Sequence, residues 1–185
     1  MLFRIINGWL WLAFILYWLV SSFGVKKYAP GSRRRGIVVR IFFLLAVIGI
    51  FNSRGFRALR LALLPPPVRF LGILITVAGM AFAVWARRHI GRNWGVPMSL
   101  KQDPELITSG PYRIVRHPIY TGILVAVLGS GLSVDFRWFI WFLFLFIYFS
   151  YSGATEEKIL TAQFPVEYPE YKKRTPGRIF PRPSI

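Results

Sequence analysis

The sequence has no cysteine and little acidic charge, and both shortages narrow its possible chemistry. Without a thiol, neither a disulfide framework nor a thiolate metal site can exist. Asp and Glu together number 7 among 185 residues, and His numbers 2. The chain also lacks a His-Glu-x-x-His run, a phosphate-binding glycine-rich loop and a serine elbow. We therefore expect no bound metal, no P-loop chemistry and no serine hydrolase.

Apolar and basic residues dominate instead. The chain is 55% hydrophobic and 17% aromatic, with a mean hydropathy of +0.48, which is too apolar for a soluble globular domain. A net charge of +17 would suit a nucleic-acid-binding protein, but the basic residues lie between long apolar runs and not along one polar face. That distribution is typical of a membrane protein with basic cytoplasmic loops. We expect a single integral-membrane domain, residues 1–185, surrounded by membrane lipid and without a nucleic-acid partner.

The apolar runs predict an all-α bundle of about five membrane-spanning helices. A helix of about 20 apolar residues spans the hydrocarbon core of a bilayer, which is about 30 Å thick. The runs are Ile5–Val25, Ile37–Ser53, Val68–Ala86, Pro118–Val134 and Trp138 to about Thr155. The first is Trp-rich and lacks a following small-residue cleavage site, so we expect a retained helix and not a signal peptide. The second is short and contains Arg40, whose charge must snorkel to the headgroups. Arginines at every third position from Arg54 predict an interfacial helix that ends at Pro65.

The spans divide the domain into two parts and set its orientation. Residues 1–86 hold three N-terminal helices, and residues 87–185 form the expected cofactor-binding and catalytic region. Residues 135–137 allow only a tight turn, so the last two spans form an antiparallel hairpin. Residues 91–116 form the longest polar connection, which we expect to be ordered. Lys and Arg number 18 on the side of the C-terminal tail and 6 on the other, so the positive-inside rule places the N-terminus outside and the tail and site in the cytoplasm.

The stretch Gly110–Gly122 marks the point where a basic loop enters an apolar helix. Pro118 suits the first helical position, which puts His117 at the cap and Tyr120 one turn further on the same side. Free N–H groups and the positive end of the helix dipole favour a bound anion at this terminus, such as a carboxylate. The pattern indicates a binding site, although His117 and Tyr120 can equally be interfacial anchors.

Two acidic residues complete the candidate site. Glu156 and Glu157 follow the fifth span, and the hairpin brings them to the face that holds His117. A zwitterionic ligand would suit these groups, with its carboxylate at the helix terminus and Arg116, and its ammonium or hydroxyls at a glutamate. S-adenosylmethionine has those groups and a sulfonium that aromatic faces stabilise. Composition alone does not favour it over a nucleotide.

Two sequence blocks in the second half of the chain point to a family. The first block is Leu106-Ile107-Thr108-Ser109-Gly110-Pro111-Tyr112-Arg113 followed by Arg116-His117-Pro118-Ile119-Tyr120-Thr121-Gly122, and the second is Glu156-Glu157 with Leu160, Phe164, Tyr168, Tyr171, Arg174-Thr175 and Phe180-Pro181. In this order, one helical hairpin apart, they resemble the isoprenylcysteine carboxyl methyltransferase family over roughly Trp94–Pro181. The resemblance implies methyl transfer from S-adenosylmethionine, inside the membrane, to a lipophilic or prenylated substrate with an isoprenylcysteine-like carboxylate.

The resemblance also implies roles for residues. The cofactor would be bound by Leu106, Thr108, Gly110, Tyr112, His117, Tyr120, Glu156 and Glu157. Arg113 and Arg116 would bind the carboxylate of the substrate or the cofactor, and Arg116, Glu156 and Glu157 would be catalytic. With an amine acceptor, a glutamate would serve as the base. Three alternatives stay open: a phospholipid-type N-methyltransferase, an NADPH-dependent sterol-type reductase, and a non-enzymatic membrane protein.

Overall fold

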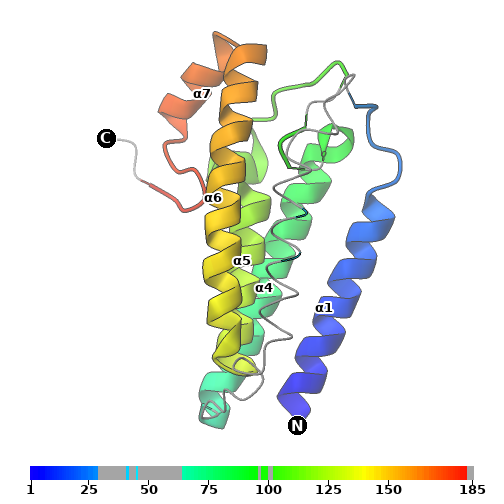
Figure 1. Ribbon diagram of the computed structural model, residues 1–185, viewed down its shortest axis with the longest axis vertical. Coiled ribbons are helices and arrows are strands. Elements are labelled where there is room, and N and C mark those ends of the chain that lie inside the picture. Colours follow the sequence, from blue (N-terminus) through cyan, green and yellow to red (C-terminus); the bar gives the residue numbers. More distant parts are fainter. Residues whose placement is uncertain (29–40, 42–44, 46–63, 96, 100–101, 183–185) are drawn as a thin grey trace.

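The protein is a bundle of helices (Figure 1). The computed structural model describes residues 1–28, 41, 45, 64–95, 97–99 and 102–182. The α-helices are α1 (Leu2–Ser21), α4 (Pro66–Ile90), α5 (Pro118–Ser133), α6 (Arg137–Gln163) and α7 (Glu167–Arg174), and the 3-10 helices are η2 (Gly91–Asn93) and η3 (Gly110–Arg113). No strand occurs in these ranges, and the predicted all-α fold is confirmed.

The long helices agree with the predicted membrane spans. Within the described ranges, α1, α4 and α6 are long and apolar enough to cross a membrane, and α5 is a shorter apolar helix of 16 residues. Helix α4 starts two residues before the predicted Val68, because proline is tolerated in the first turn of a helix. The predicted second span, Ile37–Ser53, and the interfacial helix after it fall outside the described residues, apart from Ile41 and Leu45.

Helix α6 differs from the prediction at its end. We expected the fifth span to stop at about Thr155, but α6 continues without interruption to Gln163. The sequence after Thr155 is rich in Glu, Lys, Leu, Ala and Gln, which favour the helix even where it leaves the apolar layer. Glu156 and Glu157 therefore lie inside a rigid helix, and their directions are fixed by its geometry.

Helices α4 and α5 pack closely along stripes of small residues. A Cβ atom added at Gly79 would lie 2.4 Å from the backbone nitrogen of Ala126, and one at Gly129 would lie 2.4 Å from that of Thr76. Such distances show that the two backbones are in direct contact, as small residues at helical spacing allow. The α4–α5 interface is thus formed by small residues at helical spacing on both helices.

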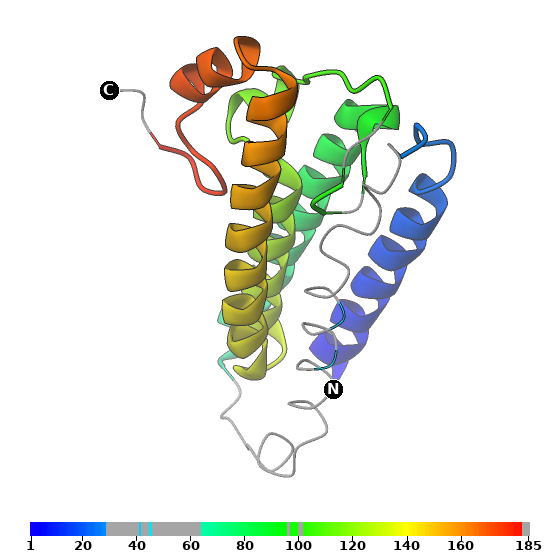
Figure 2. The ribbon, with the colours of Figure 1, turned by 45° about the horizontal axis from the view of Figure 1, so that its top comes forward.

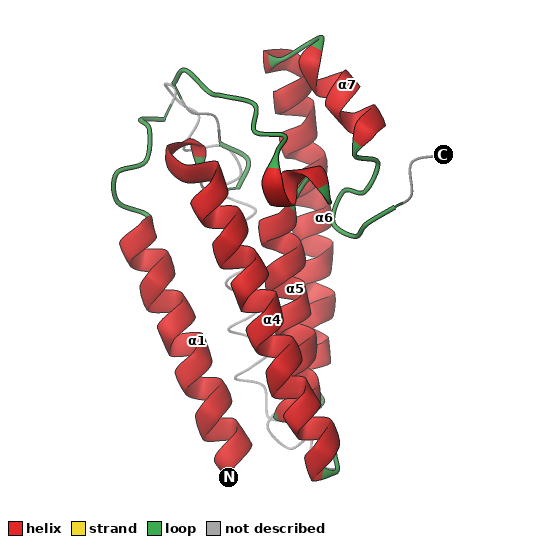
Figure 3. Ribbon diagram, turned by 180° about the vertical axis from the view of Figure 1, so that it is seen from behind, coloured by secondary structure: helices red, strands yellow, loops and turns green. Residues whose placement is uncertain are grey.

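Helix α1 lies on the α4 side of this pair (Figure 3), and a buried polar contact joins it to α5. The side-chain amide of Asn7 donates to the hydroxyls of Ser130, at 3.0 Å, and Ser133, at 3.2 Å. The indole of Trp11 donates to the same Ser130 oxygen at 3.0 Å. These hydrogen bonds lie among apolar helices, where an unpaired amide would be costly, so they fix α1 against α5.

The C-terminal part of the chain folds over one end of the bundle (Figure 2). Helices α5 and α6 form the predicted hairpin, whose turn is held by Asp135 accepting from the Arg137 backbone at 3.1 Å and from its guanidinium at 2.6 Å. Beyond α6, helix α7 and the segment after it return to the start of α5. We call residues 175–179 the tail strap. The N-terminus lies at the opposite end of the bundle (Figure 1).

Candidate active site

The start of α5 supplies an aromatic stack. Helix α5 begins at Pro118 with His117 at the cap, as predicted. The His117 ring lies parallel to that of Tyr120, with centroids 5.3 Å apart, and Tyr120 stacks on Phe149 of α6 at 4.3 Å. His117 and Tyr120 are both less than one tenth exposed. They are therefore packed parts of a wall and not anchors in an open interface.

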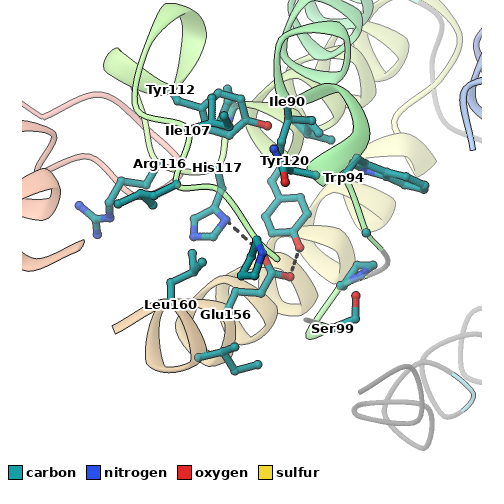
Figure 4. A pocket seen from close by; sticks show the side chains of 18 of the residues that line it. Ile90, Trp94, Ser99, Ile107, Tyr112, Arg116, His117, Tyr120, Glu156 and Leu160 are labelled. Atoms are coloured by element: carbon teal, nitrogen blue, oxygen red, sulfur yellow. Dashed lines mark hydrogen bonds and ion pairs between the residues drawn. The ribbon is translucent and has the colours of Figure 1, made fainter. Parts of the chain in front are cut away.

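Glu156 is held beside this stack in one orientation (Figure 4). Its Oε1 accepts hydrogen bonds from the Tyr120 hydroxyl at 2.5 Å, the Ser152 hydroxyl at 3.0 Å and the backbone N–H of Met98 at 3.0 Å. Its Oε2 lies 3.5 Å from Nδ1 of His117. Charge-assisted bonds of this kind are short and strong, so the carboxylate is preorganised.

Glu157 has different surroundings. Its side chain is 4% exposed, and its Oε1 accepts from Nε of Arg116 at 2.9 Å and from Nε of Arg178 at 2.9 Å. Nε2 of His117 lies 3.6 Å from the same oxygen. Because neighbouring positions of a helix differ by about 100°, Glu157 turns toward the tail strap while Glu156 turns toward the stack.

A cavity of about 260 Å³ opens beside the stack. Its polar side includes Glu156, His117, Tyr120, Tyr112 and Arg116. The rest of the lining comes from α1, α4, α5, α6, α7 and residues 93–107, and its apolar members include Trp18, Ile90, Trp94, Leu106, Ile107, Ile119, Ile123, Phe149, Ile159 and Leu160. The site therefore combines a charged wall with a large apolar surface.

The predicted site residues divide into two groups. The cavity lining contains Leu106, Tyr112, Arg116, His117, Tyr120 and Glu156. Thr108, Gly110 and Glu157 lie outside that lining, and Arg113 is exposed on η3. Arg116 lines the cavity, but its Nη1 donates to the carbonyls of Thr175 at 2.6 Å and Pro176 at 2.8 Å, and Figure 4 shows its guanidinium directed away from Glu156.

Gly110 shapes the site through its backbone. It has a φ of +58°, and a Cβ atom there would lie 2.7 Å from the His89 ring. The His89 ring is fixed by a contact of 2.9 Å between its Nε2 and the Ser109 hydroxyl, and it stacks on Tyr112. Both the left-handed backbone and the close ring therefore require glycine at this position.

The charges around His117 oppose the effect of its burial. Burial alone would lower the pKa of His117, but contacts with the carboxylates of Glu156 and Glu157 outweigh it, and the pKa is raised above its ordinary value. The imidazole thus favours its charged form between two carboxylates. Burial has the opposite effect on an acid and raises the pKa of Tyr112 on the cavity wall, so the Tyr112 phenol stays neutral.

Three groups that hydrogen-bond to the carboxylates of Glu156 and Glu157 were not predicted from the sequence. Ser152 lies four residues before Glu156 on α6, and that helical spacing was a usable signal. The Met98 amide and the Arg178 guanidinium come from irregular segments, for which no periodic pattern exists. In the described part of the chain, no group of three or more His, Cys, Asp or Glu side chains is placed to hold a metal ion.

Comparison with known proteins agrees with this architecture. The family model described as phospholipid methyltransferase matches residues 68–166, which is just over half of the chain. The cobalt-zinc-cadmium resistance protein CzcN of Cupriavidus metallidurans is 36% identical over 99 residues, covering 52% of this chain and 45% of that protein. The nickel-cobalt-cadmium resistance protein NccN of Alcaligenes xylosoxydans xylosoxydans is 33% identical over 99 residues, covering 52% and 46%.

A further relative is named for a methyl transfer. Protein-S-isoprenylcysteine O-methyltransferase of Schizosaccharomyces pombe is 34% identical over 111 residues, covering 59% of this chain and 45% of that protein. The chain thus spans about half the length of these curated relatives. The region matched by the family model runs from α4 to the end of α6 and contains the stack, Glu156 and Glu157. The chain belongs to the phospholipid methyltransferase family.

Proposed function

We propose that this protein is an integral-membrane methyltransferase that uses S-adenosylmethionine to methylate a lipophilic acceptor. The observation that supports this most directly is the cavity, where the fixed carboxylate of Glu156 stands beside an aromatic stack and faces an apolar lining. A carboxylate suits the ammonium of the cofactor, aromatic faces suit its sulfonium, and apolar walls suit a lipid chain. The donor set therefore fits the methyl donor that the family implies.

The residues of the wall would bind and orient the reactants. When bound, S-adenosylmethionine supplies an electrophilic methyl group. Glu156 would hold the ammonium in one place, because Tyr120, Ser152 and the Met98 amide already fix its Oε1. His117 would hold Glu156 from its other oxygen, and Arg116, which is paired with Glu157, would add positive potential at the edge of the lining. Orientation of this kind can lower a barrier by about 7–11 kcal/mol.

The acceptor we favour is a carboxylate on a lipid-linked molecule, such as an isoprenylcysteine-like group. The name of the Schizosaccharomyces pombe relative supports this choice. A carboxylate is already a nucleophile, so the wall would need only to align it and exclude water. The apolar lining from α1, α5 and α6 would receive the lipid part. We further propose that the N-terminus is outside and the cavity faces the cytoplasm, in line with the basic residues of the adjoining loops.

An amine acceptor is the second candidate, and one feature of the wall favours it. Glu156 faces the cavity, whereas Arg116, the one Lys or Arg of its described lining, donates from Nε to Glu157 and from Nη1 to two carbonyls. A carboxylate acceptor would have no uncommitted side-chain cation among these residues, while an amine would find in Glu156 both a counter-charge and a base. This chemistry corresponds to the phospholipid-type N-methyltransferase.

One labelling experiment separates these functions. Purified protein in lipid is given S-adenosylmethionine labelled at its methyl group, with a prenylated cysteine or phosphatidylethanolamine as acceptor. A methyl ester releases volatile labelled methanol in alkali, whereas an N-methyl group stays in the lipid. Loss of label in Glu156→Gln, with full label in the surface variant Lys173→Gln, assigns the transfer to the cavity. NADPH oxidation by a sterol without methyl transfer would favour a reductase, and inactivity in every arm would contradict an enzymatic function.

A further inference from the structure

The tail strap is tied to the start of α5 by its backbone. The N–H of Arg116 donates to the carbonyl of Gly177 at 3.0 Å, and the N–H of His117 donates to the carbonyl of Arg178 at 2.9 Å. The Thr121 hydroxyl donates to the carbonyl of Ile179, whose side chain is buried in the core beside Tyr120. The strap therefore has a fixed position directly behind the cavity wall.

The Arg178 side chain meets Glu157 from the strap. Its Nε and Nη2 lie 2.9 Å and 3.2 Å from Oε1 and Oε2 of Glu157, which is a bidentate pair. A Cβ atom added at Gly153 would lie 3.2 Å from Nε2 of His117 and 3.5 Å from Cδ of Arg178. His117 and Arg178 thus both lie close to Gly153 of α6, and both approach the carboxylate of Glu157.

One buried carboxylate consequently shares its charge among several cations. Arg116, Arg178 and His117 all approach Oε1 of Glu157, and Lys172 lies 3.6 Å from Oε2. If one of these cations is removed, more of the negative charge acts on those that remain. A carboxylate near an imidazole favours its protonated form, so the loss of a competing cation strengthens that effect.

We infer that Arg178 is a positioning residue of the site, which acts through Glu157 on the charge and the placement of His117. The chain of contacts is short: Arg178 binds Glu157, Glu157 touches Nε2 of His117, and Nδ1 of His117 lies 3.5 Å from Oε2 of Glu156 on the cavity wall. The tail strap is then part of the site although Arg178 does not line the cavity. We call this series of contacts from Arg178 through Glu157 to His117 the link. An effect of the link on methyl transfer rests on the proposed function, but the contacts themselves do not.

Other charged or polar groups also face His117 and must stay constant in a test. These are Glu156 on α6 and the Tyr120 ring on α5, while Arg116, the residue before His117, approaches the same Glu157 oxygen as His117. None of them is altered by a change at Arg178. The contribution of the strap can therefore be measured as a shift in the pKa of His117 alone.

The small number of histidines in the chain allows the pKa of His117 to be measured without signals from many other imidazoles. The sequence has two histidines, so a His89→Gln background leaves a single imidazole signal in NMR spectra of histidine-labelled, ligand-free protein in detergent. In this background, Arg178→Gln is expected to raise the pKa of His117 by about one unit. Glu157→Gln is expected to lower it, and Arg178→Lys to return it most of the way. Lys173→Gln, whose ammonium pairs with the exposed Glu170 at 2.8 Å, is the matched control and should give no shift.

The outcomes decide the inference without any methyl-transfer assay. A pKa of His117 that stays within about 0.2 unit in Arg178→Gln, with the thermal unfolding transition retained, overturns the link. If Arg178→Gln does not fold, Lys172→Gln removes a cation whose side chain is 43% exposed, and it should raise the pKa by a smaller amount. No rise there also overturns the link. An inactive protein with the expected shifts would contradict the proposed function and leave the link intact.

Discussion

Glu156 and Glu157 are neighbours in sequence, but the turn of α6 places them in different surroundings and therefore gives them different roles. Glu156 is part of the cavity wall, and Glu157 is buried among guanidinium groups behind it. We predict that Glu156→Gln weakens cofactor binding about 10- to 100-fold, because a charge-assisted contact is worth about 1.5–3 kcal/mol. Glu157→Gln should instead destabilise the fold by about 3–5 kcal/mol, because it leaves buried cations without their carboxylate. Titration calorimetry and thermal unfolding of both variants measure the two effects.

The two variants are controls for each other. Each removes one negative charge from the same turn of α6, so a general electrostatic effect would change binding and stability alike in both. If Glu157→Gln lost cofactor binding while keeping its unfolding temperature, the division of roles given above would be wrong.

At Gly110, backbone conformation and a close neighbour act together. Gly91 offers a matched comparison, because it also has a positive φ, +54°, but has nothing within 4 Å of an added Cβ atom. We predict that Gly91→Ala costs about 1–3 kcal/mol of stability, because its backbone, with a ψ of −128°, lies in a region that residues with a Cβ atom rarely adopt. Gly110→Ala should cost more, since its methyl group meets the His89 ring. Adding His89→Ala should recover part of that excess, and equal losses at Gly91 and Gly110 would exclude the ring contact as a cause.

Single residues were predictable from sequence where a local rule applied. Pro118 fixes the start of α5, so helical spacing alone places His117 and Tyr120 on one face. The different directions of Glu156 and Glu157 also followed from helical geometry, but which of them faces the cavity did not, because the rotation of α6 depends on packing. The Met98 amide could not be foreseen, since nearly every residue carries a backbone N–H.

At the scale of elements, periodic segments were predictable and irregular ones were not. The short turn at Asp135 required a hairpin, and small residues at helical spacing marked the α4–α5 interface. The return of the tail to the start of α5 was not predicted. The strap is held by backbone carbonyls of residues 175–179, and carbonyl positions leave no trace in side-chain patterns.

The α4–α5 interface gives a prediction for a whole element. Gly79→Leu places a side chain where the α5 backbone lies 2.4–2.6 Å from the new Cβ atom, so α4 and α5 must separate. We expect a loss of stability of about 3 kcal/mol, at the upper end of the usual cost of overpacking, and a weaker cofactor site, because α5 carries His117 and Tyr120. Gly8→Leu on α1 is the matched control, since it has nothing within 4 Å, and it should be nearly neutral. A shift in unfolding temperature of similar size in both variants would contradict direct backbone contact.

The two ends of the whole molecule are held together by different kinds of contact. At one end, Asn7 and two serines hold α1 to α5 through uncharged hydrogen bonds. At the other end, α5, α6 and the tail strap gather His117, two glutamates and two arginines around the cavity wall. The ionic end contains the buried imidazole of His117, so folding of the entire bundle becomes sensitive to pH through this residue.

The direction of that sensitivity follows from the raised pKa of His117. A group with a higher pKa in the folded state binds its proton more tightly there, so its contribution to stability is complete below the unfolded value of about 6.5 and is lost as pH rises through the folded value. Over that interval, stability should fall by at most about 1.4 kcal/mol per pH unit, or roughly 3–6 °C in unfolding temperature. His117→Gln has no such proton and should flatten this part of the profile, while His89→Gln should keep it. Thermal unfolding in detergent, followed from pH 6 to 9 for the parent chain and the two variants, measures the difference. An unfolding temperature that rises with pH in the parent chain but not in His117→Gln would show that His117 is held neutral between the two glutamates.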